Sequence, residues 1–524
     1  MKKQTFLCGI FILALGTLFA KIIGAIYRIP LTWMLGVEGL GIYQLVYPIF
    51  SLLIIISSTG ASTAISAMVS ERIKQNNLVE AHKIFRLSAI SLTIIGLLFA
   101  FLLIALSSII SNIQGNALAT LPYIAISLAI PFVAILSAYR GYYQGCQNML
   151  PTAISQIIEQ LGKLVFGLIL GSVLLPMGIQ YGVVGAFLGV VIGEIVSVLI
   201  LFIYSYFKKR KIKFTPPTYN QPILTNKMLL IELFKRTTPI LLASLLLPLI
   251  QVLDSLLVVN LLSGAGFDTN QSTSIWGIYS GVVTSIINLP IILSLSICTS
   301  IVPEITTTSS TIDKPKITKA FNLTLNIAIP SMFAIMILAP SIITLLYGNT
   351  FDSLLVDELT LSINLLVLSS FIIPLLSIMQ IQNATLQGLN KSTIPLYNIL
   401  LSSVLKILLV VILVKIPSIY IYGFLIANIT FYLSAVILNQ YYINKRLKVS
   451  QSFGNIFPVL ISTSIMSMVL LVSRFAFVNF SLYLSLPLQV IIGLITYFST
   501  LLVTDKQLFA SFPIQNLLCR VYKK

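Results

Sequence analysis

The sequence predicts an all-α protein that crosses a membrane about fourteen times. Three observations lead to this prediction: 57% of the 524 residues are hydrophobic, only 9% are charged, and the apolar residues gather into long uninterrupted stretches. About 20 apolar residues in a helix cross the hydrocarbon core of a bilayer. The strands of a membrane barrel need only about ten residues of alternating character. The lengths of the stretches therefore favour helices.

The predicted spans form two groups of six and a final pair. The first group covers residues 6–35, 42–70, 87–110, 118–140, 152–175 and 180–207. The second covers residues 237–262, 275–301, 321–347, 359–385, 393–414 and 419–443, and the final pair covers 454–473 and 482–503. We therefore expect an N-terminal lobe at 1–207, a basic cytoplasmic linker at 208–236, a C-terminal lobe at 237–449, and two further spans with a cytoplasmic tail at 450–524.

The placement of basic residues predicts the orientation of the chain. With both termini in the cytoplasm, 26 of the 32 Lys and Arg residues fall in cytoplasmic segments. Cytoplasmic loops of membrane proteins are generally rich in these residues. We therefore attribute the net charge of +18 to topology and to contact with anionic lipid head groups, and we expect no nucleic-acid partner.

Short motifs recur in the same order in the two groups of spans, at offsets between 233 and 244 residues. A unit of six spans returns the chain to the side on which it began, so two copies share one orientation. Two such lobes are the usual frame for alternating access. The recurring pairs are Gly41–Tyr43 with Gly277–Tyr279, Val69–Glu71 with Val302–Glu304, Gln144 and Gly145 with Gln387 and Gly388, Pro151 with Pro395, Lys163 with Lys406, and Tyr181 and Gly182 with Tyr422 and Gly423.

The first span carries two cations within a stretch that is otherwise apolar. Lys21, Gly24 and Arg28 fall on one face of a helix. A charge at mid-bilayer costs about 3 kcal/mol on insertion scales, so this face is expected to line a water-filled cavity. Alternatively, Arg28 extends to the outer interface and Lys21 pairs with an acid elsewhere. Pro30 is expected to kink or end the helix.

Five further ionisable residues lie within predicted spans, namely Glu159, Lys163, Glu194, Asp254 and Lys406. Glu159 and Lys163 are four residues apart, so they either form an ion pair on one helix or serve a function. Lys406 has no acidic neighbour on its own span, which favours a functional role or a partner on another helix.

Glu194 follows a glycine-rich run. Gly185, Gly189 and Gly193 are spaced by four residues and make a small-residue face. Such faces usually serve tight packing between helices rather than ligand contact.

Little in the sequence supports catalysis, and we expect no enzyme. The single histidine, His82, is predicted in a cytoplasmic loop. The four cysteines, Cys8, Cys146, Cys298 and Cys519, are isolated and lack the spacing of metal ligands. No predicted external loop exceeds about 15 residues, so the energy for transport is expected from an ion gradient or the membrane potential.

Three segments resemble a known family. They are KIIGAIYRIPLTWMLGVEGLGIYQLVYPIF at 21–50, GIYSGVVTSIINLPIILSLSICTSIVPEIT at 277–306, and YGNTF at 347–351. They are similar to the polysaccharide branch of the multidrug/oligosaccharidyl-lipid/polysaccharide (MOP) exporter superfamily, and within it to the stage V sporulation protein B group and the MurJ-type lipid II flippases. The resemblance covers essentially the whole chain, including its pattern of six, six and two spans.

This resemblance implies a function in the bacterial plasma membrane. The expected activity is that of a flippase, which moves a prenyl pyrophosphate-linked saccharide from the inner to the outer leaflet by alternating access. The saccharide would be a lipid II-like peptidoglycan precursor or a polysaccharide repeat unit. The resemblance also implies a groove beside the last two helices for the prenyl tail, and we expect a monomer.

The resemblance also implies two lobes around a cationic cavity, for which this chain offers Lys21, Arg28, Lys163 and Lys406. Glu159 and Glu194 are then structural or coupling acids. A sodium site in the second lobe is implied as well, with Asp254 and Asn398 as candidates. Coupling to protons or to the membrane potential is the alternative, and no other cofactor or metal is expected.

Two other classes of function stay open. A cation-coupled multidrug antiporter of the same superfamily would need an anionic cavity, whereas the cations inside the predicted spans outnumber the acids. A membrane scaffold that transports nothing would have no use for charges within its spans. Transport of a cationic dye would identify the antiporter. Charge-neutralising substitutions without effect would identify the scaffold.

Overall fold

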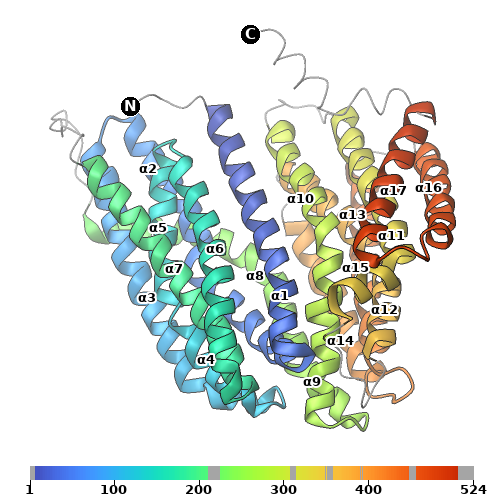
Figure 1. Cartoon of the computed structure of the whole chain (residues 1–524). Coiled ribbons are helices and arrows are strands. Elements are labelled where there is room, and N and C mark those ends of the chain that lie inside the picture. Colours follow the sequence, from blue (N-terminus) through green and yellow to red (C-terminus); the bar gives the residue numbers. More distant parts are fainter. Residues whose placement is uncertain are drawn as a thin grey trace. The chain divides into compact units, whose positions relative to one another are not determined.

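The computed structural model describes residues 6–209, 225–306, 314–348, 350, 358–389, 391, 393–447 and 456–504. All regular structure in these residues is helical (Figure 1). Thirteen helical stretches among them are long and apolar enough to cross a membrane. The first stretch, Phe11–Lys74, contains two of the predicted spans, so the all-α prediction and the count of about fourteen spans are confirmed.

The chain divides into two compact units, each described here by itself. Unit 1 comprises Met1–Ser285 and Val410–Gly423, and unit 2 comprises Ile286–Leu409 and Phe424–Lys524. The predicted division into lobes at 1–207 and 237–449 stays a prediction. Most of the predicted basic linker, residues 210–224, lies outside the described residues, as does Cys519.

Unit 1 is built from nine helices and short π- or 3₁₀-helical turns within the described residues. Its helices are α1 (Phe6–Ile54), α2 (Gly60–Lys74), α3 (Leu78–Ile113), α4 (Thr120–Ser127), α5 (Ile130–Gly145), α6 (Leu150–Leu174), α7 (Ile179–Lys209), α8 (Asn226–Gly264) and α9 (Thr269–Gly277). The turns are η1 (Ile55–Thr59), η2 (Ala117–Ala119), η3 (Leu175–Met177) and η4 (Ile278–Val283).

Unit 2 contains most of the remaining helices. They are α10 (Thr284–Thr306), α11 (Lys314–Tyr347), α12 (Glu358–Ser369), α13 (Ile372–Gly388), α14 (Thr393–Leu413), α15 (Tyr420–Leu447), α16 (Ile456–Ala476) and α17 (Leu482–Thr504). The first residues of α10, the last of α14 and the first of α15 belong to unit 1.

Helix α1 breaks at a glycine and not at the predicted proline. The helix runs through Pro30 to Ile54, and its non-helical residue is Gly36, with φ 66°. Glycine adopts positive φ without a Cβ clash, so the bend between the first two spans falls there. Pro30 has no N–H, so the carbonyl of Ile26 loses its usual helical donor, yet the helix continues. Proline is tolerated in membrane helices where neighbouring groups satisfy the freed carbonyl. Thr32 nearby donates a side-chain hydrogen bond of 2.8 Å to the carbonyl of Arg28.

Helices α6 and α7 make the most extensive helix–helix contact in the described part of the chain. Glycines on both helices bring the two backbones together. A Cβ atom on Gly162 would lie 2.5 Å from the Cα of Gly193, and one on Gly193 would lie 2.7 Å from the carbonyl oxygen of Glu159. The structure therefore has the tight packing expected of the small-residue face of α7.

The two copies of the Gly-Ile-Tyr motif meet within unit 1. A Cβ atom on Gly277 of α9 would lie 2.8 Å from the backbone nitrogen of Gly41 on α1. Asn116 donates a hydrogen bond of 2.9 Å to Thr273 nearby on α9. The glycines of both motifs thus allow the backbones of α1 and α9 to touch where the two helices cross.

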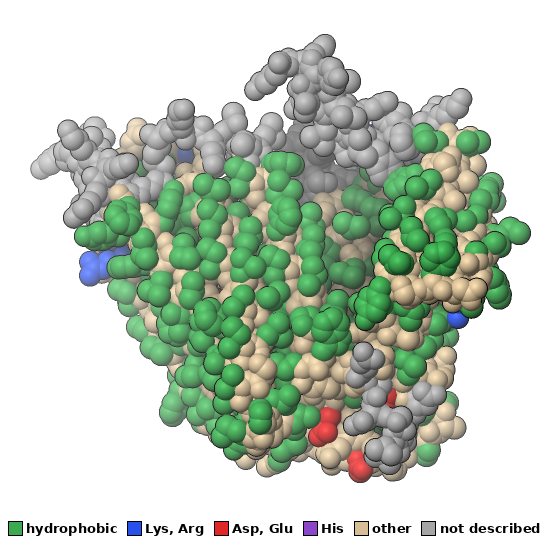
Figure 2. Space-filling view, viewed as in Figure 1, with side chains coloured by type: hydrophobic (Ala, Val, Ile, Leu, Met, Phe, Trp, Pro, Cys, Tyr) green, Lys and Arg blue, Asp and Glu red, His purple; other side chains and the backbone are tan. Residues whose placement is uncertain are grey.

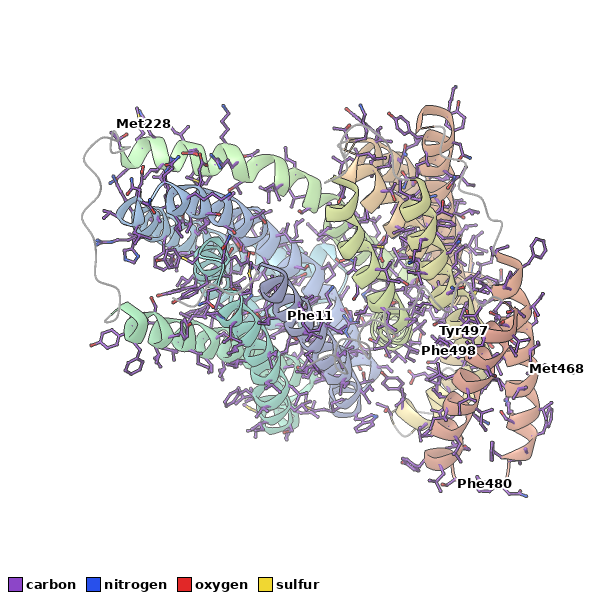
Figure 3. The ribbon with its side chains drawn as sticks, turned by 90° about the horizontal axis from the view of Figure 1, so that it is seen from above. Phe11, Met228, Met468, Phe480, Tyr497 and Phe498 are labelled. Carbon is purple, nitrogen blue, oxygen red and sulfur yellow. The ribbon has the colours of Figure 1, made fainter. Side chains whose placement is uncertain are left out.

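The core of unit 2 joins α11 to α13, α16 and α17. Tyr497 of α17 is buried and donates a hydrogen bond of 2.9 Å to the carbonyl of Asn326 on α11. Tyr497 and Met468 lie on the neighbouring helices α17 and α16 (Figure 3). Met468 is 70% exposed, as expected of a side chain that faces lipid.

Apolar side chains cover much of the visible surface of the helices (Figure 2). On α3, for example, Ile94, Phe101 and Ile109 are exposed, whereas Leu92 and Leu103 are buried. A helix with apolar residues on both its buried and its exposed faces is expected where the surroundings are lipid.

We predict that Gly189→Ala destabilises unit 1. A Cβ atom at this position would overlap the backbone of Gly167, so the two helices would have to move apart. Overpacking of this kind costs about 1 to 3 kcal/mol. A lower melting temperature of the purified protein in detergent would show the effect. Gly264→Ala is the matched control, because its Cβ would meet nothing within 4 Å. Equal melting temperatures for the two variants would contradict the packing argument.

The orientation inferred from loop charges predicts how engineered cysteines react. Asp268 caps α9 through Gln271, so the neighbouring exposed Asn270 is the better external position. In a cysteine-free variant, Asn270→Cys should react with an impermeant thiol reagent applied to intact cells. Gln75→Cys, exposed in the turn between α2 and α3, should react only after permeabilisation. The reverse pattern would invert the topology.

Candidate functional site

Four ionisable side chains from three packed helices of unit 1 form what we call the charge cluster. It consists of Arg140 on α5, Glu159 and Lys163 on α6, and Glu194 on α7. The close approach of α6 and α7 produces this grouping, since Gly193 packs directly on the backbone between Glu159 and Lys163. All four residues lie on helices that could span a membrane, where ionisable groups are costly and usually functional.

The carboxylate of Glu159 is bound by Arg140. Arg140 Nη2 donates to Glu159 Oε2 at 2.8 Å, and Arg140 Nε donates to the hydroxyl of Ser155 at 3.0 Å. Gln160 Nε2 donates to the other carboxylate oxygen at 3.1 Å. The self-pairing of Glu159 with Lys163, one of the two sequence interpretations, is therefore wrong: a guanidinium from a neighbouring helix offers directed donors that the ammonium lacks.

Lys163 points instead towards the aromatic rings of α1. Its Nζ lies 5.1 Å from the centroid of the Tyr27 ring, 6.0 Å from that of Tyr43 and 5.2 Å from that of Tyr47. A cation within about 6 Å of a ring face is attracted by the electron-rich π-system. We call these three residues the tyrosine cage. The hydroxyl of Tyr43 also lies within hydrogen-bonding reach of Lys163, whereas the buried hydroxyl of Tyr27 has no hydrogen-bond partner among the described residues.

Glu194 is the most deeply buried member of the charge cluster. Glu194 is only 4% exposed. Its Oε2 atom has no hydrogen-bond partner in the described part of the chain. The charges that act on it are those of Glu159, Arg140 and Lys163. Glu194 therefore lies beside an ion pair and a caged lysine, not opposite a dedicated cation.

The cations of α1 are placed differently from one another. Lys21 is exposed, whereas Arg28 is half-buried and donates a hydrogen bond of 3.0 Å to the hydroxyl of Ser285. Between them, Gly24 is covered by the side chain of Gln160, whose Oε1 would lie 2.9 Å from a Cβ there. Part of α6 thus packs against α1 at Gly24, between the two cations. Whether Lys21 and Arg28 share one cavity stays a prediction.

Lys406 of unit 2 occupies a setting like that of Lys163. It is 3% exposed, and its Nζ lies 5.2 Å from the ring centroid of Phe424 and 5.7 Å from that of Phe431. Both rings belong to α15, next in the chain after the helix that carries Lys406. The two lysines that correspond in the internal repeat are thus each held over aromatic rings.

The two candidates for a sodium site lie in different units. Asp254 is 9% exposed on α8 of unit 1, and Asn398 is on α14 of unit 2. Asn398 donates a hydrogen bond of 2.8 Å to Asn439, which donates one of 2.9 Å to Asn383. This chain of amides joins α13, α14 and α15. The pairing of Asp254 with Asn398 stays a prediction.

Neither the histidine nor the described cysteines form a metal site. Within the described residues, no group of three or more His, Cys, Asp or Glu side chains could hold a metal ion. His82 lies near the start of α3, with its ring centroid 5.7 Å from that of Phe85. Neither Cys146 nor Cys298 forms a disulfide bond with a described residue.

Sequence reasoning missed Arg140 and the tyrosine cage. Arg140 was predicted at the cytoplasmic end of a span, but α5 continues to Gly145, so the guanidinium lies more than one turn inside the helix. The sequence did contain one signal. Gly141 and Gly145 are four residues apart, which is the spacing of a helix-packing face and indicates that the helix continues beyond Arg140. The tyrosines gave no sequence signal, since aromatic residues are common in membrane spans.

The fold and the charge cluster define a polytopic helical membrane protein with polar chemistry inside its spans. Such proteins are typically transporters. A family model described as polysaccharide biosynthesis protein matches residues 6–309. The chain belongs to this family, and the predicted membership of the MOP superfamily is confirmed.

Relatives in Bacillus subtilis (strain 168) cover most of the chain. Stage V sporulation protein B is 26% identical over 459 residues, which is 86% of each chain. Lipid II flippase MurJ is 26% identical over 425 residues, which is 78% of this chain and 77% of that protein.

Solved structures show the same fold. A structure of lipid II flippase MurJ in an inward closed conformation has a TM-score of 0.70 at 17% identity, covering 95% of this chain and all of that one. An inward-facing multidrug resistance MATE family transporter of the MOP superfamily has a TM-score of 0.62 at 16% identity, covering 83% of this chain and 96% of that one. This chain is therefore a multi-pass bacterial membrane protein with a MOP-superfamily fold.

The ion pair between Arg140 and Glu159 makes a prediction about stability. Arg140→Gln should lower the melting temperature strongly, because it leaves the carboxylate of Glu159 in the helix bundle without its guanidinium. The two side chains are only partly buried, at 17% and 22% exposed, so the loss should lie between the values for exposed and for buried pairs, about 1 to 3 kcal/mol. The double variant Arg140→Gln with Glu159→Gln should recover much of the loss in a thermal melt of the purified protein. If the two single losses simply add, the residues do not act as a pair.

Proposed function

We propose that this protein is a flippase for a prenyl pyrophosphate-linked saccharide, which it moves from the inner to the outer leaflet by alternating access. The observation that carries the proposal is the state of Lys163. Its ammonium is held by the tyrosine cage, while the nearest acid on its own helix is bound by Arg140. An intramembrane cation stabilised by neutral rings keeps its positive charge for an anionic ligand.

The charge balance supports an anionic substrate. The cations within the predicted spans are Lys21, Arg28, Lys163 and Lys406, and the acids are Glu159, Glu194 and Asp254. The structure adds Arg140 inside α5 and Glu38 inside α1, so the cations still outnumber the acids by one. A diphosphate head group cannot enter hydrocarbon without replacement of its hydration, and fixed cations supply that replacement. The same balance argues against a transporter of cationic drugs.

A groove in unit 2 suits the prenyl tail. It has a cavity volume of about 320 Å³ and lies between α11 and α16, lined by Phe333, Leu460, Thr463, Ser464, Ser467, Met468 and Leu471. Four of these seven side chains are apolar, and Met468 is exposed at the outer face of α16 (Figure 3). A hydrocarbon chain lying there would stay in contact with lipid while its head group crosses.

The names of the relatives point the same way. One is described as lipid II flippase MurJ, and another as stage V sporulation protein B. Lipid II joins a prenyl pyrophosphate to a peptidoglycan precursor, so that relative acts on the class of substrate that the charge balance favours. Whether the saccharide here is a peptidoglycan precursor or a polysaccharide repeat unit is part of the proposal and of its test.

Coupling to sodium is a further part of the proposal. The buried carboxylate of Asp254 is a hard oxygen donor of the kind that sodium prefers, so this side of the site fits the ion. Asn398 belongs to unit 2, where its amide nitrogen donates to Asn439, so we restrict the proposed sodium ligand to Asp254. When bound, the ion would supply positive charge beside α8.

Arg28 provides the test of the proposed function. Arg28→Ala should abolish flipping of lipid II in proteoliposomes, because it removes a planar cation that can bind a phosphate through two donors. Loss of one partner in a desolvated charged contact weakens binding about thirty-fold or more. Arg28→Lys should recover part of the activity, since the charge remains and the planar fork is lost.

Arg474→Ala is the matched control. Arg474 is an exposed cation in the last turn of α16 and should be dispensable. Full activity of Arg28→Ala at normal abundance would sink the anionic-substrate proposal. Failure of the wild-type protein to flip lipid II, combined with transport of another prenyl-linked saccharide, would change the substrate and keep the class.

A further inference from the structure

The carboxyl group of Glu194 is placed where a permanent negative charge is hard to maintain. The residue is 4% exposed, lies on a membrane-spanning helix, and has a carboxylate oxygen without any hydrogen-bond partner in the described residues. A carboxylate that loses its water without gaining donors carries a large desolvation cost. The neutral acid avoids this cost.

Glu159, the other acid of the charge cluster, is in the opposite situation. It accepts hydrogen bonds from Arg140 at 2.8 Å and from Gln160 at 3.1 Å. Donors of this kind stabilise the charged form of a carboxyl group. Of the two acids, therefore, Glu194 is the one suited to gain and lose a proton.

The helices packed on α7 define the charges around Glu194. Helix α6 contributes Glu159 and Lys163, and α5 contributes Arg140. Helix α1 carries three charged residues. Lys21 is exposed, Arg28 donates to Ser285, and Glu38 has Asp268 as its charged neighbour. Helix α4 has no charged side chain.

The protonation state of Glu194 sets the net charge of the charge cluster. Arg140 and Lys163 supply two positive charges and Glu159 one negative charge. With Glu194 ionised the four groups are neutral, and with Glu194 protonated they carry one net positive charge. The tyrosine cage is uncharged, so this change is felt at the ammonium of Lys163.

We propose that Glu194 is a proton-binding site whose occupation strengthens the binding of a phosphate-bearing lipid head at Lys163. A proton from water binds Glu194 Oε2 and forms a carboxylic acid, which removes the negative charge that competes with the ligand for Lys163. Release of the ligand favours return of the proton to water. By linkage, the proton strengthens ligand binding by the factor by which the ligand strengthens proton binding.

This inference rests on the proposed function for the identity of the ligand and goes beyond it in naming the proton site. The experiment uses the full-length protein in lipid nanodiscs with geranylgeranyl pyrophosphate as the probe. Wild-type protein should take up protons from a weakly buffered solution when the probe binds. Its affinity should rise about 5- to 150-fold as the pH is lowered, the usual range for coupled sites.

Glu194→Gln mimics the protonated acid and should remove the proton uptake. It should also bind the probe tightly across the pH range, apart from the titration of the probe's own phosphates, which is common to all variants. Glu80→Gln is the matched control. Glu80 is 5% exposed, as buried as Glu194, and its Oε1 also lacks a hydrogen-bond partner among the described residues. Its Oε2, however, accepts a hydrogen bond from Asn77 and lies 3.4 Å from Arg72, so Glu80→Gln should leave the proton uptake unchanged.

A second measurement needs no ligand. Infrared difference spectra between low and high pH should show the C=O stretch of a protonated carboxyl group that is absent in Glu194→Gln and present in Glu80→Gln and Glu159→Gln. Persistence of this band in Glu194→Gln, or undiminished proton uptake in that variant, would overturn the inference. If the wild-type protein shows the band but binds no prenyl pyrophosphate, the proton site stands and the proposed substrate fails.

Discussion

The close packing of α6 against α7 is the constraint on which the charge cluster depends. Gly162 of α6 and Gly193 of α7 meet with no side chain between them, so the two backbones touch. Glu194 is carried next to Glu159 and Lys163 as a direct result. Any larger residue at these glycines would separate the helices and with them the charges. In a membrane, where helices gain little from hydrophobic association, such contacts also supply much of the packing energy.

The chain places its intramembrane charges in three different ways. Arg140 and Glu159 form an ion pair. Each also has a neutral partner, since Arg140 donates to Ser155 and Glu159 accepts from Gln160. Lys163 and Lys406 are each stabilised by aromatic rings, which lower the cost of a cation without cancelling its charge. Glu194 has neither arrangement, and its oxygen without a partner is the reason to regard it as protonatable. These differences separate structural charges from charges that are available to a ligand or a proton.

Much of the fold was predictable, because span length and loop charge are local properties of a membrane protein. Apolar stretches must be about as long as the bilayer is thick, and their backbones must be helical to satisfy their own hydrogen bonds. The bend in α1 was less predictable. Pro30 was the expected breaking point, yet α1 continues through it and bends at Gly36. A proline in the interior of a helix removes one backbone hydrogen bond, but the tertiary structure decides whether the helix breaks there.

The sequence by itself determined that this chain is a helical membrane protein, that its spans repeat, and that Glu159, Lys163, Glu194 and Lys406 lie within them. It also indicated the MOP superfamily, to which the family match assigns the chain. Only the tertiary structure decided which charges meet. Glu159 and Lys163 are one helical turn apart, and this spacing permits a pair, but the donors of Arg140 on another helix bind Glu159 and the rings of α1 hold Lys163. Helical periodicity sets neighbours along one helix, whereas the partner of a buried charge depends on which helices pack together and how closely.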